Sequence, residues 1–264
     1  SNFVRLAAAA AARLGLHCHV QLEDRVAHDN FAYRNSGNVL LDRLLGATVH
    51  YFPEGEDEVA ADARIREIAD TLAEQGRRPY VIPLAPGHPP LGALGYVDCA
   101  EEILEQCGDD GRPNAFDEII VASGSGSTHG GLVFGLRSRG DATPVLGVCV
   151  RRSSALQTPR IQHRCRELAA LLHVDNPVPD ADVRTDDTDL APGYGQCAPH
   201  VQDVILRFAR REAILCDPVY TGKVCAAVVR RAQALGAGKR LLMMHTGGTP
   251  GLFAYPELNV AASA

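Results

Sequence analysis

Near its middle the chain carries the stretch Val121-Ala122-Ser123-Gly124-Ser125-Gly126-Ser127-Thr128-His129-Gly130-Gly131. An apolar run precedes it over 116–122 and another follows over 132–136, which predicts a strand, a glycine-serine loop and a helix. Glycines let several backbone N–H groups turn into one concavity, and the helix N-terminus adds positive potential. The stretch therefore predicts a phosphate site, with a flexible surface turn as the alternative.

The loop matches neither of two common nucleotide-binding motifs. It lacks the Gly-Lys-Ser/Thr ending of a P-loop, and no acidic residue follows at the distance of a ribose-binding carboxylate. A small cofactor that bears a phosphate is therefore favoured over a nucleotide, although a nucleotide-binding α/β domain remains a lesser alternative.

Composition limits the class of protein. The 264 residues are 46% hydrophobic and 22% charged, with a formal net charge of −6, which indicates a globular fold and argues against nucleic acid as a partner. Apolar runs fall short of the roughly 20 residues that cross a bilayer, so no membrane is expected. Eight scattered cysteines without metal-ligand spacing predict reduced thiols, no metal site and a cytoplasmic location.

Apolar periodicity alternates between helix and strand along the chain. Strands are predicted at 18–22, 48–52, 79–83, 119–122, 145–150, 213–215 and 241–244, with helices between them. This order predicts an α/β fold of two open parallel-sheet domains with flanking helices. A turn-rich segment, 84–90, suggests a boundary between a small domain, 1–90, on the substrate side and a large domain, 91–264. Residues 177–195 are expected to form an acidic irregular excursion.

Two further loops resemble strand-to-helix turns. One is Cys216-Asp217-Pro218-Val219-Tyr220-Thr221-Gly222-Lys223, and the other is His245-Thr246-Gly247-Gly248-Thr249-Pro250. Ligands of open α/β sheets bind at the carboxyl ends of strands, so three such loops on one edge would form one pocket.

Seven short motifs then occur in a fixed order. They are Ser1-Asn2-x-x-Arg5, Ser36-Gly37-Asn38, Gly92-Ala93-Leu94-Gly95-Tyr96, 123–131, Pro192-Gly193-Tyr194-Gly195, 217–223 and 245–250. Together they resemble the pyridoxal-phosphate enzymes of the D-cysteine desulfhydrase and 1-aminocyclopropane-1-carboxylate deaminase family, which also contains L-cysteate sulfo-lyase. The resemblance implies fold type II, pyridoxal 5'-phosphate as cofactor, a large domain that binds it, a small amino-acid substrate and a homodimer.

The resemblance also assigns roles to single residues. The phosphate would be held by the backbone of Gly124, Ser125, Gly126, Ser127 and Thr128. Around the ring, Tyr220 would stack, Thr221 would face the ring nitrogen, Asn2 would bind the phenolic oxygen, and Thr246 and Gly247 would close the pocket. The catalytic set would be Ser1, Tyr194 and Tyr220, with Ser1 at the substrate carboxylate or in proton transfer and Tyr194 on the substrate side.

Position 221 bears on the reaction. The deaminases carry glutamate there and the desulfhydrases threonine, and a hydroxyl cannot neutralise a protonated ring nitrogen as a carboxylate can. The resemblance therefore implies β-elimination on a substrate such as D-cysteine, giving pyruvate, ammonia and hydrosulfide. L-Cysteate sulfo-lyase and 1-aminocyclopropane-1-carboxylate deaminase are the alternative enzymes.

The sequence departs from the family at its lysines. The family's Schiff-base lysine lies in a segment before the position of Ser1, whereas the two lysines here are Lys223 and Lys239. Both are expected to be solvated surface residues. The chain as given is therefore expected to be nearly inactive, with its large domain incomplete at the N-terminal side. A fragment that binds phosphate or cofactor without catalysis is the alternative of a different class.

Overall fold

The computed structural model describes residues 1–26, 30–83, 87–107 and 116–258. These form two compact units, one of Ser1–His88 with the segment from Gly248 onward, the other of Pro89–Gly247. The sequence-based division placed 91–264 together, whereas the structure groups the segment from Gly248 with the first unit. The physical reason is a tertiary contact: the 3₁₀ helix η3 (Thr249–Ala254) packs on the helices α2 (Phe31–Asn35) and α3 (Gly37–Leu44) of that unit.

The first unit is built on a short parallel ladder. Strands β1 (His19–Glu23) and β2 (Thr48–Phe52) pair in parallel. The α-helices described alongside them are α1 (Asn2–Arg13), α2 (Phe31–Asn35), α3 (Gly37–Leu44) and α4 (Glu58–Glu74). η3 is tied to this unit by the Ser36 hydroxyl, which donates to the Phe253 carbonyl at 2.8 Å.

A third strand expected at 79–83 is wrong, because these residues adopt no regular structure. The Tyr80 side chain is 78% exposed, so the apolar letters of this segment do not correspond to a buried face. Residues 84–86 of the predicted boundary turn lie outside the described residues.

The second unit contains a parallel sheet with strand order β5-β4-β3-β6. Its strands are β3 (Glu118–Ser123), β4 (Val145–Cys149), β5 (Arg184–Asp186) and β6 (Leu241–Met243). The predicted α/β architecture with parallel sheets is therefore confirmed. Non-consecutive neighbours follow from crossover helices, which parallel strands require.

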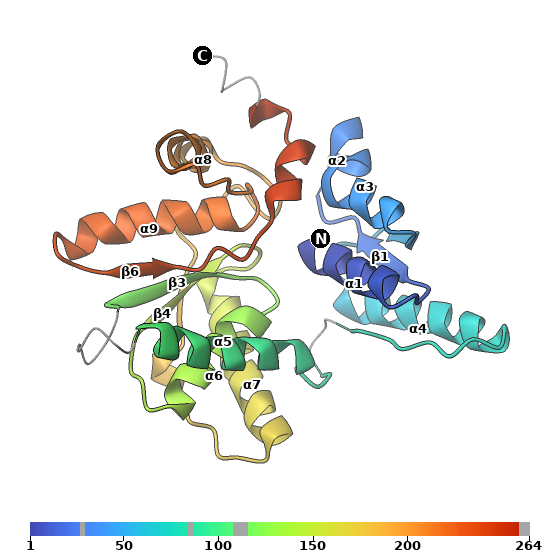
Figure 1. Cartoon of the computed structure of the whole chain (residues 1–264), viewed down its shortest axis with the longest axis horizontal. Helices are drawn as coiled ribbons and strands as arrows, with labels where there is room; N and C mark the ends of the chain where they lie inside the picture. Colours follow the sequence, from blue (N-terminus) through green and yellow to red (C-terminus); the bar gives the residue numbers. More distant parts are fainter. Residues whose placement is uncertain (27–29, 84–86, 108–115, 259–264) are drawn as a thin grey trace. The chain divides into compact units, whose positions relative to one another are not determined.

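Helices cover both faces of this sheet, as Figure 1 shows for the green, yellow and orange parts of the chain. On one side lie α5 (Leu91–Cys107), α6 (Ser127–Ser138) and α7 (Ser154–Leu172), and on the other α8 (Pro199–Glu212) and α9 (Thr221–Leu235). None of the described helices combines the length and the apolar character that crossing a bilayer requires.

The central strand β3 is buried on both faces, and its side chains alternate between two apolar clusters. Ile119 and Val121 join the cluster that contains Leu132 and Phe134 of α6, whereas Ile120 and Ala122 join the one that contains Val224 and Ala227 of α9. Because both faces of β3 are buried, the position of its C-terminal end is fixed. The glycine-serine loop begins at this end.

Two strand predictions in this unit are wrong. Residues 213–215 form no strand: Ala213 ends α8 in a left-handed conformation (φ 55°), and the two residues after it adopt no regular structure. The edge strand is instead β5, within the segment expected to be irregular. β5 has no apolar pattern: its backbone pairs with β4, and its Arg184 side chain pairs with the buried Glu118 at 3.2 Å.

Candidate active site

The predicted phosphate loop lies between the end of β3 and the start of α6. Ser123 is the last residue of β3, and Gly126, with φ 97°, occupies the cap position before Ser127. That backbone conformation is unfavourable for residues with a Cβ atom and explains glycine at this position. The first turn of α6 thus directs N–H groups without intrahelical acceptors toward the loop.

Side chains of α7 bind the carbonyl groups of the loop. Gln157 Nε2 donates to Gly124 O at 3.0 Å and to Ser123 Oγ at 2.9 Å, and Arg160 Nε donates to Ser125 O at 3.1 Å. Because the C=O and the following N–H of a trans peptide point in opposite directions, the N–H groups of Ser125 and Gly126 face away from these donors. The loop is therefore held in an orientation that presents N–H groups to an anion.

His129 supports the loop through its contact with Ser123, at the end of β3. Its ring is completely buried against Gly147 of β4, and its Nδ1 lies 3.1 Å from Ser123 Oγ. Burial lowers the pKa of His129 to about 4, against a smaller opposing effect of a hydrogen bond with the Val145 backbone. The imidazole is therefore neutral at physiological pH, and its Nδ1 shares a hydrogen bond with the Ser123 hydroxyl.

Acid is expected to weaken the second unit through His129. The imidazole has a pKa of ~6.5 in the unfolded state and about 4 in the folded state. Between these pH values the unfolded state binds a proton and the folded state does not. Stability is fully present above pH 6.5 and falls by about 3 kcal/mol on acidification to pH 4. Urea unfolding across this range measures it, and the variant His129→Asn is expected to lose the part of the slope that the wild type shows between pH 6.5 and 5. An unchanged slope in that window would contradict the assignment.

Tyr220 lies beside the loop. A Cβ atom placed on Gly124 would stand 3.8 Å from Cε1 of the Tyr220 ring and 3.2 Å from Cγ2 of Val150. Glycine at 124 thus lets the backbone of the phosphate loop approach Val150 and the aromatic ring closely. Tyr194 approaches from the segment after β5: its hydroxyl lies 2.7 Å from that of Tyr220, and the rings meet edge to face at 6.1 Å.

Asp217 organises the turn that carries Tyr220. Its carboxylate accepts hydrogen bonds from the N–H groups of Val219, Tyr220 and Thr221, each at 3.0 Å, and from the Thr221 hydroxyl at 2.7 Å. The same hydroxyl oxygen accepts the Asp217 N–H at 2.8 Å. The Thr221 proton is therefore committed to Asp217, and the hydroxyl can offer only a lone pair to a ligand.

The third predicted loop lies next to this turn. His245 Nε2 donates to the Leu215 carbonyl at 2.9 Å, and its Nδ1 accepts the Gly247 N–H at 3.4 Å, which orders the backbone through Thr246. Cys216 and Cys225 bring their sulfur atoms to 3.2 Å, and the hydrogen bond from Cys225 is the main cause that lowers the pKa of Cys216 to about 7.

The remaining predicted site residues belong to the first unit. Ser1 caps α1 by accepting the Val4 N–H at 3.4 Å, and the side-chain amide of Asn38 donates to Asn2 Oδ1 at 2.8 Å. The structure thus orders Ser1 and Asn2 together with the Ser36-Gly37-Asn38 motif. Their part in a site with the phosphate loop stays a prediction.

The expectation that both lysines are solvated is wrong for Lys223. Its side chain is completely buried, and Nζ donates to the carbonyls of Leu190 at 2.8 Å and Gly193 at 3.0 Å. Burial lowers the pKa of Lys223 to about 8. Lys239 is half-exposed and pairs with Asp117 at 2.9 Å.

Comparison with known proteins identifies the family. Residues 1–247 match the family model described as pyridoxal-phosphate dependent enzyme. The chain belongs to the pyridoxal-phosphate dependent enzymes. A solved structure titled as an ACC deaminase homologue is 33% identical with a TM-score of 0.82, and the match covers 99% of this chain and 75% of that one. O-ureido-L-serine synthase is 18% identical with a TM-score of 0.61, covering 100% of this chain and 78% of that one, and shares the fold.

The predicted cofactor and the assignment to fold type II are thereby confirmed, since pyridoxal-phosphate dependent enzymes of this fold supply the match. Sequence reasoning missed several residues that shape the site of this pyridoxal-phosphate dependent enzyme: Gln157, Arg160, His129, Asp217 and Lys223. Asp217 had a local signal, an aspartate four residues before the helix start. The α7 residues had none, because they reach the loop from more than thirty positions away.

Proposed function

We propose that the second unit binds pyridoxal phosphate with its phosphate at the loop 124–128 and its ring against Tyr220, and that the protein catalyses β-elimination on a small amino acid such as D-cysteine. The observation that carries the cofactor pose is the close approach of Gly124, in the phosphate loop, to the Tyr220 ring. Arg152 and Arg160, which reach the loop carbonyls, add positive charge around it.

Pyridoxal phosphate, when bound, withdraws electrons from the substrate's α-carbon so that a proton and a β-substituent can leave. The Tyr194 and Tyr220 hydroxyls share one hydrogen bond, which commits one of their two protons. In the proposal, a phenol proton of this pair is transferred to the departing group. In this proposal Tyr194 supplies or orients that proton on the substrate side.

Thr221 favours elimination over ring opening. Its hydroxyl proton is held by the carboxylate of Asp217, so it presents neither a negative charge nor a donor toward a ring nitrogen. A ring nitrogen that is not stabilised as a cation makes the cofactor a weaker electron sink, which is sufficient when a good β-leaving group such as hydrosulfide is present. L-Cysteate and 1-aminocyclopropane-1-carboxylate remain the alternative substrates.

The two lysines of the 264 residues support a further element of the proposal. Lys223 Nζ is bound to two carbonyls inside the protein, and Lys239 pairs with Asp117. Neither lysine offers an unengaged amine to the cofactor aldehyde. We therefore propose that the 264 residues hold pyridoxal phosphate without a covalent bond and turn over substrate poorly. Borohydride treatment followed by peptide mapping is expected to find no adduct confined to Lys223. A stoichiometric adduct there would overturn this element.

A titration with pyridoxal phosphate tests the cofactor pose. The variant Gly124→Ala places a methyl group 3.2 Å from Val150 Cγ2 and 3.8 Å from Tyr220 Cε1, which displaces the loop relative to the ring, and we expect it to weaken binding about 30-fold, or about 2 kcal/mol. Gly95→Ala is the matched control, because a Cβ on that α5 residue meets nothing within 4 Å. Equal affinities for Gly124→Ala and the wild type would place the cofactor elsewhere.

Product analysis separates the substrates. Hydrosulfide from D-cysteine supports the proposed reaction, sulfite from L-cysteate supports the sulfo-lyase, and ammonia from 1-aminocyclopropane-1-carboxylate supports the deaminase. Cofactor binding without any product supports the non-catalytic alternative. The proposed homodimer is tested on the same preparation by sedimentation.

A further inference from the structure

Lys223 is the most unusual charged residue of the second unit. A lysine side chain is rarely fully buried, because removing an ammonium group from water is costly unless hydrogen bonds replace its hydration. Lys223 meets this condition with two backbone carbonyls of one loop, Leu190 O and Gly193 O. The residue after Gly193 is Tyr194, whose hydroxyl contacts Tyr220.

We propose that Lys223 is a positioning residue, whose ammonium group binds the carbonyls of Leu190 and Gly193 and thereby holds the Tyr194 hydroxyl against that of Tyr220. Its consequence for catalysis rests on the proposed function, which gives Tyr194 its place beside the substrate. The positional statement itself concerns the second unit alone and holds with or without cofactor.

The chemistry of lysine suits this task. An ammonium group carries three donors and no acceptor, so it can bridge two carbonyl oxygens that turn inward from an irregular segment. Lys223 lies in the first turn of α9, two residues after Thr221, and α9 is packed on the sheet. The loop is therefore fastened to the same helix start that carries Tyr220, which couples the positions of the two tyrosines.

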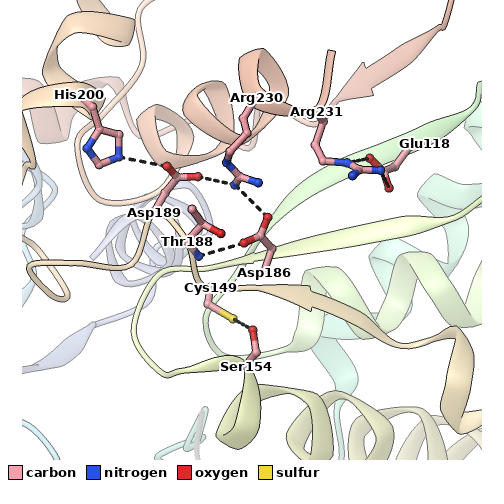
Figure 2. Close-up of polar contacts among 9 residues, drawn as sticks. All are labelled: Glu118, Cys149, Ser154, Asp186, Thr188, Asp189, His200, Arg230 and Arg231. Atoms are coloured by element: carbon pink, nitrogen blue, oxygen red, sulfur yellow. Dashed lines mark hydrogen bonds and ion pairs between the residues drawn. The ribbon is translucent and has the colours of Figure 1, made fainter. Parts of the chain in front are cut away.

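Charged residues hold the start of the segment that runs from Leu190 to Tyr194. Asp189 precedes Leu190, and its carboxylate accepts from Arg230 at 2.8 Å and lies 3.0 Å from His200 Nε2. Arg230 also binds Asp186 of β5 at 2.9 Å, so the loop is tied back to the sheet edge, as Figure 2 shows. Burial lowers the pKa of Lys223, whereas Cys197 and, to a smaller extent, Asp189 raise it, so the ammonium form is available near neutral pH.

This arrangement makes the loop a segment held at two points. The bonds of Arg230 fix it before Leu190, and Lys223 fixes it from Leu190 to Gly193. Loss of the ammonium group would leave two inward carbonyls without their donor and release the end that carries Tyr194. We expect the segment 190–195 to move while the sheet and α9 keep their packing.

Fluorine NMR of the protein labelled with 3-fluorotyrosine tests the proposal without cofactor. The chain has seven tyrosines, and the Tyr220 signal is assigned by its loss in Tyr220→Phe. Tyr194→Phe removes the hydroxyl partner and shifts that signal. We expect Lys223→Met to produce a shift of the same direction and similar size, and the double variant to add little to it. Lys239→Met, which removes the surface lysine, is the control and leaves the signal in place.

A Tyr220 signal at its wild-type position in a folded Lys223→Met protein would overturn the proposal, as would shifts spread over most of the seven signals, which indicate general loosening. Should Lys223→Met fail to fold, Lys223→Gln keeps a donor too short to bridge both carbonyls and is expected to give an intermediate shift. No shift in a folded Lys223→Gln protein would equally overturn it.

Kinetics extend the test where the protein turns over substrate. Lys223→Met is then expected to lower kcat/KM about tenfold with unchanged affinity for pyridoxal phosphate, and Tyr194→Phe to show the same loss without additivity. Failure to bind the cofactor at all would refute the proposed function and leave the NMR result as it stands.

Discussion

Replacing Gly147 by alanine is expected to destabilise the second unit by about 4 kcal/mol, because the new methyl group would overlap a buried ring. A Cβ at this position would lie 2.2 Å from Nδ1 and 2.3 Å from Cε1 of His129. The ring cannot move away freely, since it is completely buried and bound to Ser123 at the base of the phosphate loop. Urea unfolding measures the loss, and weaker binding of pyridoxal phosphate is expected to accompany it.

The control for this substitution is Gly92→Ala in α5, where a Cβ meets nothing within 4 Å. Alanine is favoured over glycine in a helix by up to about 1 kcal/mol, so this variant is expected to be as stable as the wild type or slightly more stable. The double variant with His129→Ala should recover about 2 kcal/mol of the loss at Gly147, because the clash is removed. A Gly147→Ala protein within 1 kcal/mol of the wild type would contradict the packing of His129 on β4.

Replacing Asp217 by alanine is the second change with a large expected effect, about 4 kcal/mol of stability and at least a tenfold loss of cofactor affinity. Its carboxylate accepts three backbone N–H groups and the Thr221 hydroxyl in a buried turn, and each unpaired buried donor costs about 1–3 kcal/mol. The turn also sets the Tyr220 ring beside Gly124, so its loss displaces the surface against which the cofactor ring is proposed to stack.

A surface aspartate at the start of another helix gives the comparison. Asp57 accepts the Ala60 N–H at 2.9 Å before α4, in an exposed position, and Asp57→Ala is expected to cost about 1 kcal/mol. Asp217→Asn keeps one carboxyl-type oxygen and should fall between the two. Equal losses for Asp57→Ala and Asp217→Ala in urea unfolding would show that Asp217 acts as an ordinary helix cap and not as the centre of the turn.

The sequence predicted the features that depend on neighbouring residues. The apolar run of β3, the glycines after it and the helix that follows are each recognisable within about ten positions, and the structure has them where they were expected. Seven motifs in order also led to the pyridoxal-phosphate family, which the comparisons confirm. The roles of single residues toward the cofactor remain proposals.

Strand predictions failed where composition and burial diverge. The segment 79–83 is apolar yet largely exposed, and 213–215 begins with a left-handed residue that ends α8. β5 carries charged residues, and it joins the sheet by pairing with β4 and through ion pairs with Glu118 and Arg230, which are distant in sequence. A rule based on alternating hydrophobicity has no information about such partners.

Lys223 separates the two kinds of information most clearly. Its position two residues after Thr221 at a helix start gave no reason to expect burial, because lysines are usually solvated. It became a buried donor because a loop thirty residues earlier folds back over the start of α9 and turns two carbonyls toward it. Local sequence thus specified the phosphate loop, the order of elements and the family, since these follow from backbone preference and short-range pattern. Long-range packing specified which side chains support that loop, because burial and hydrogen-bond partners exist only once distant segments have met.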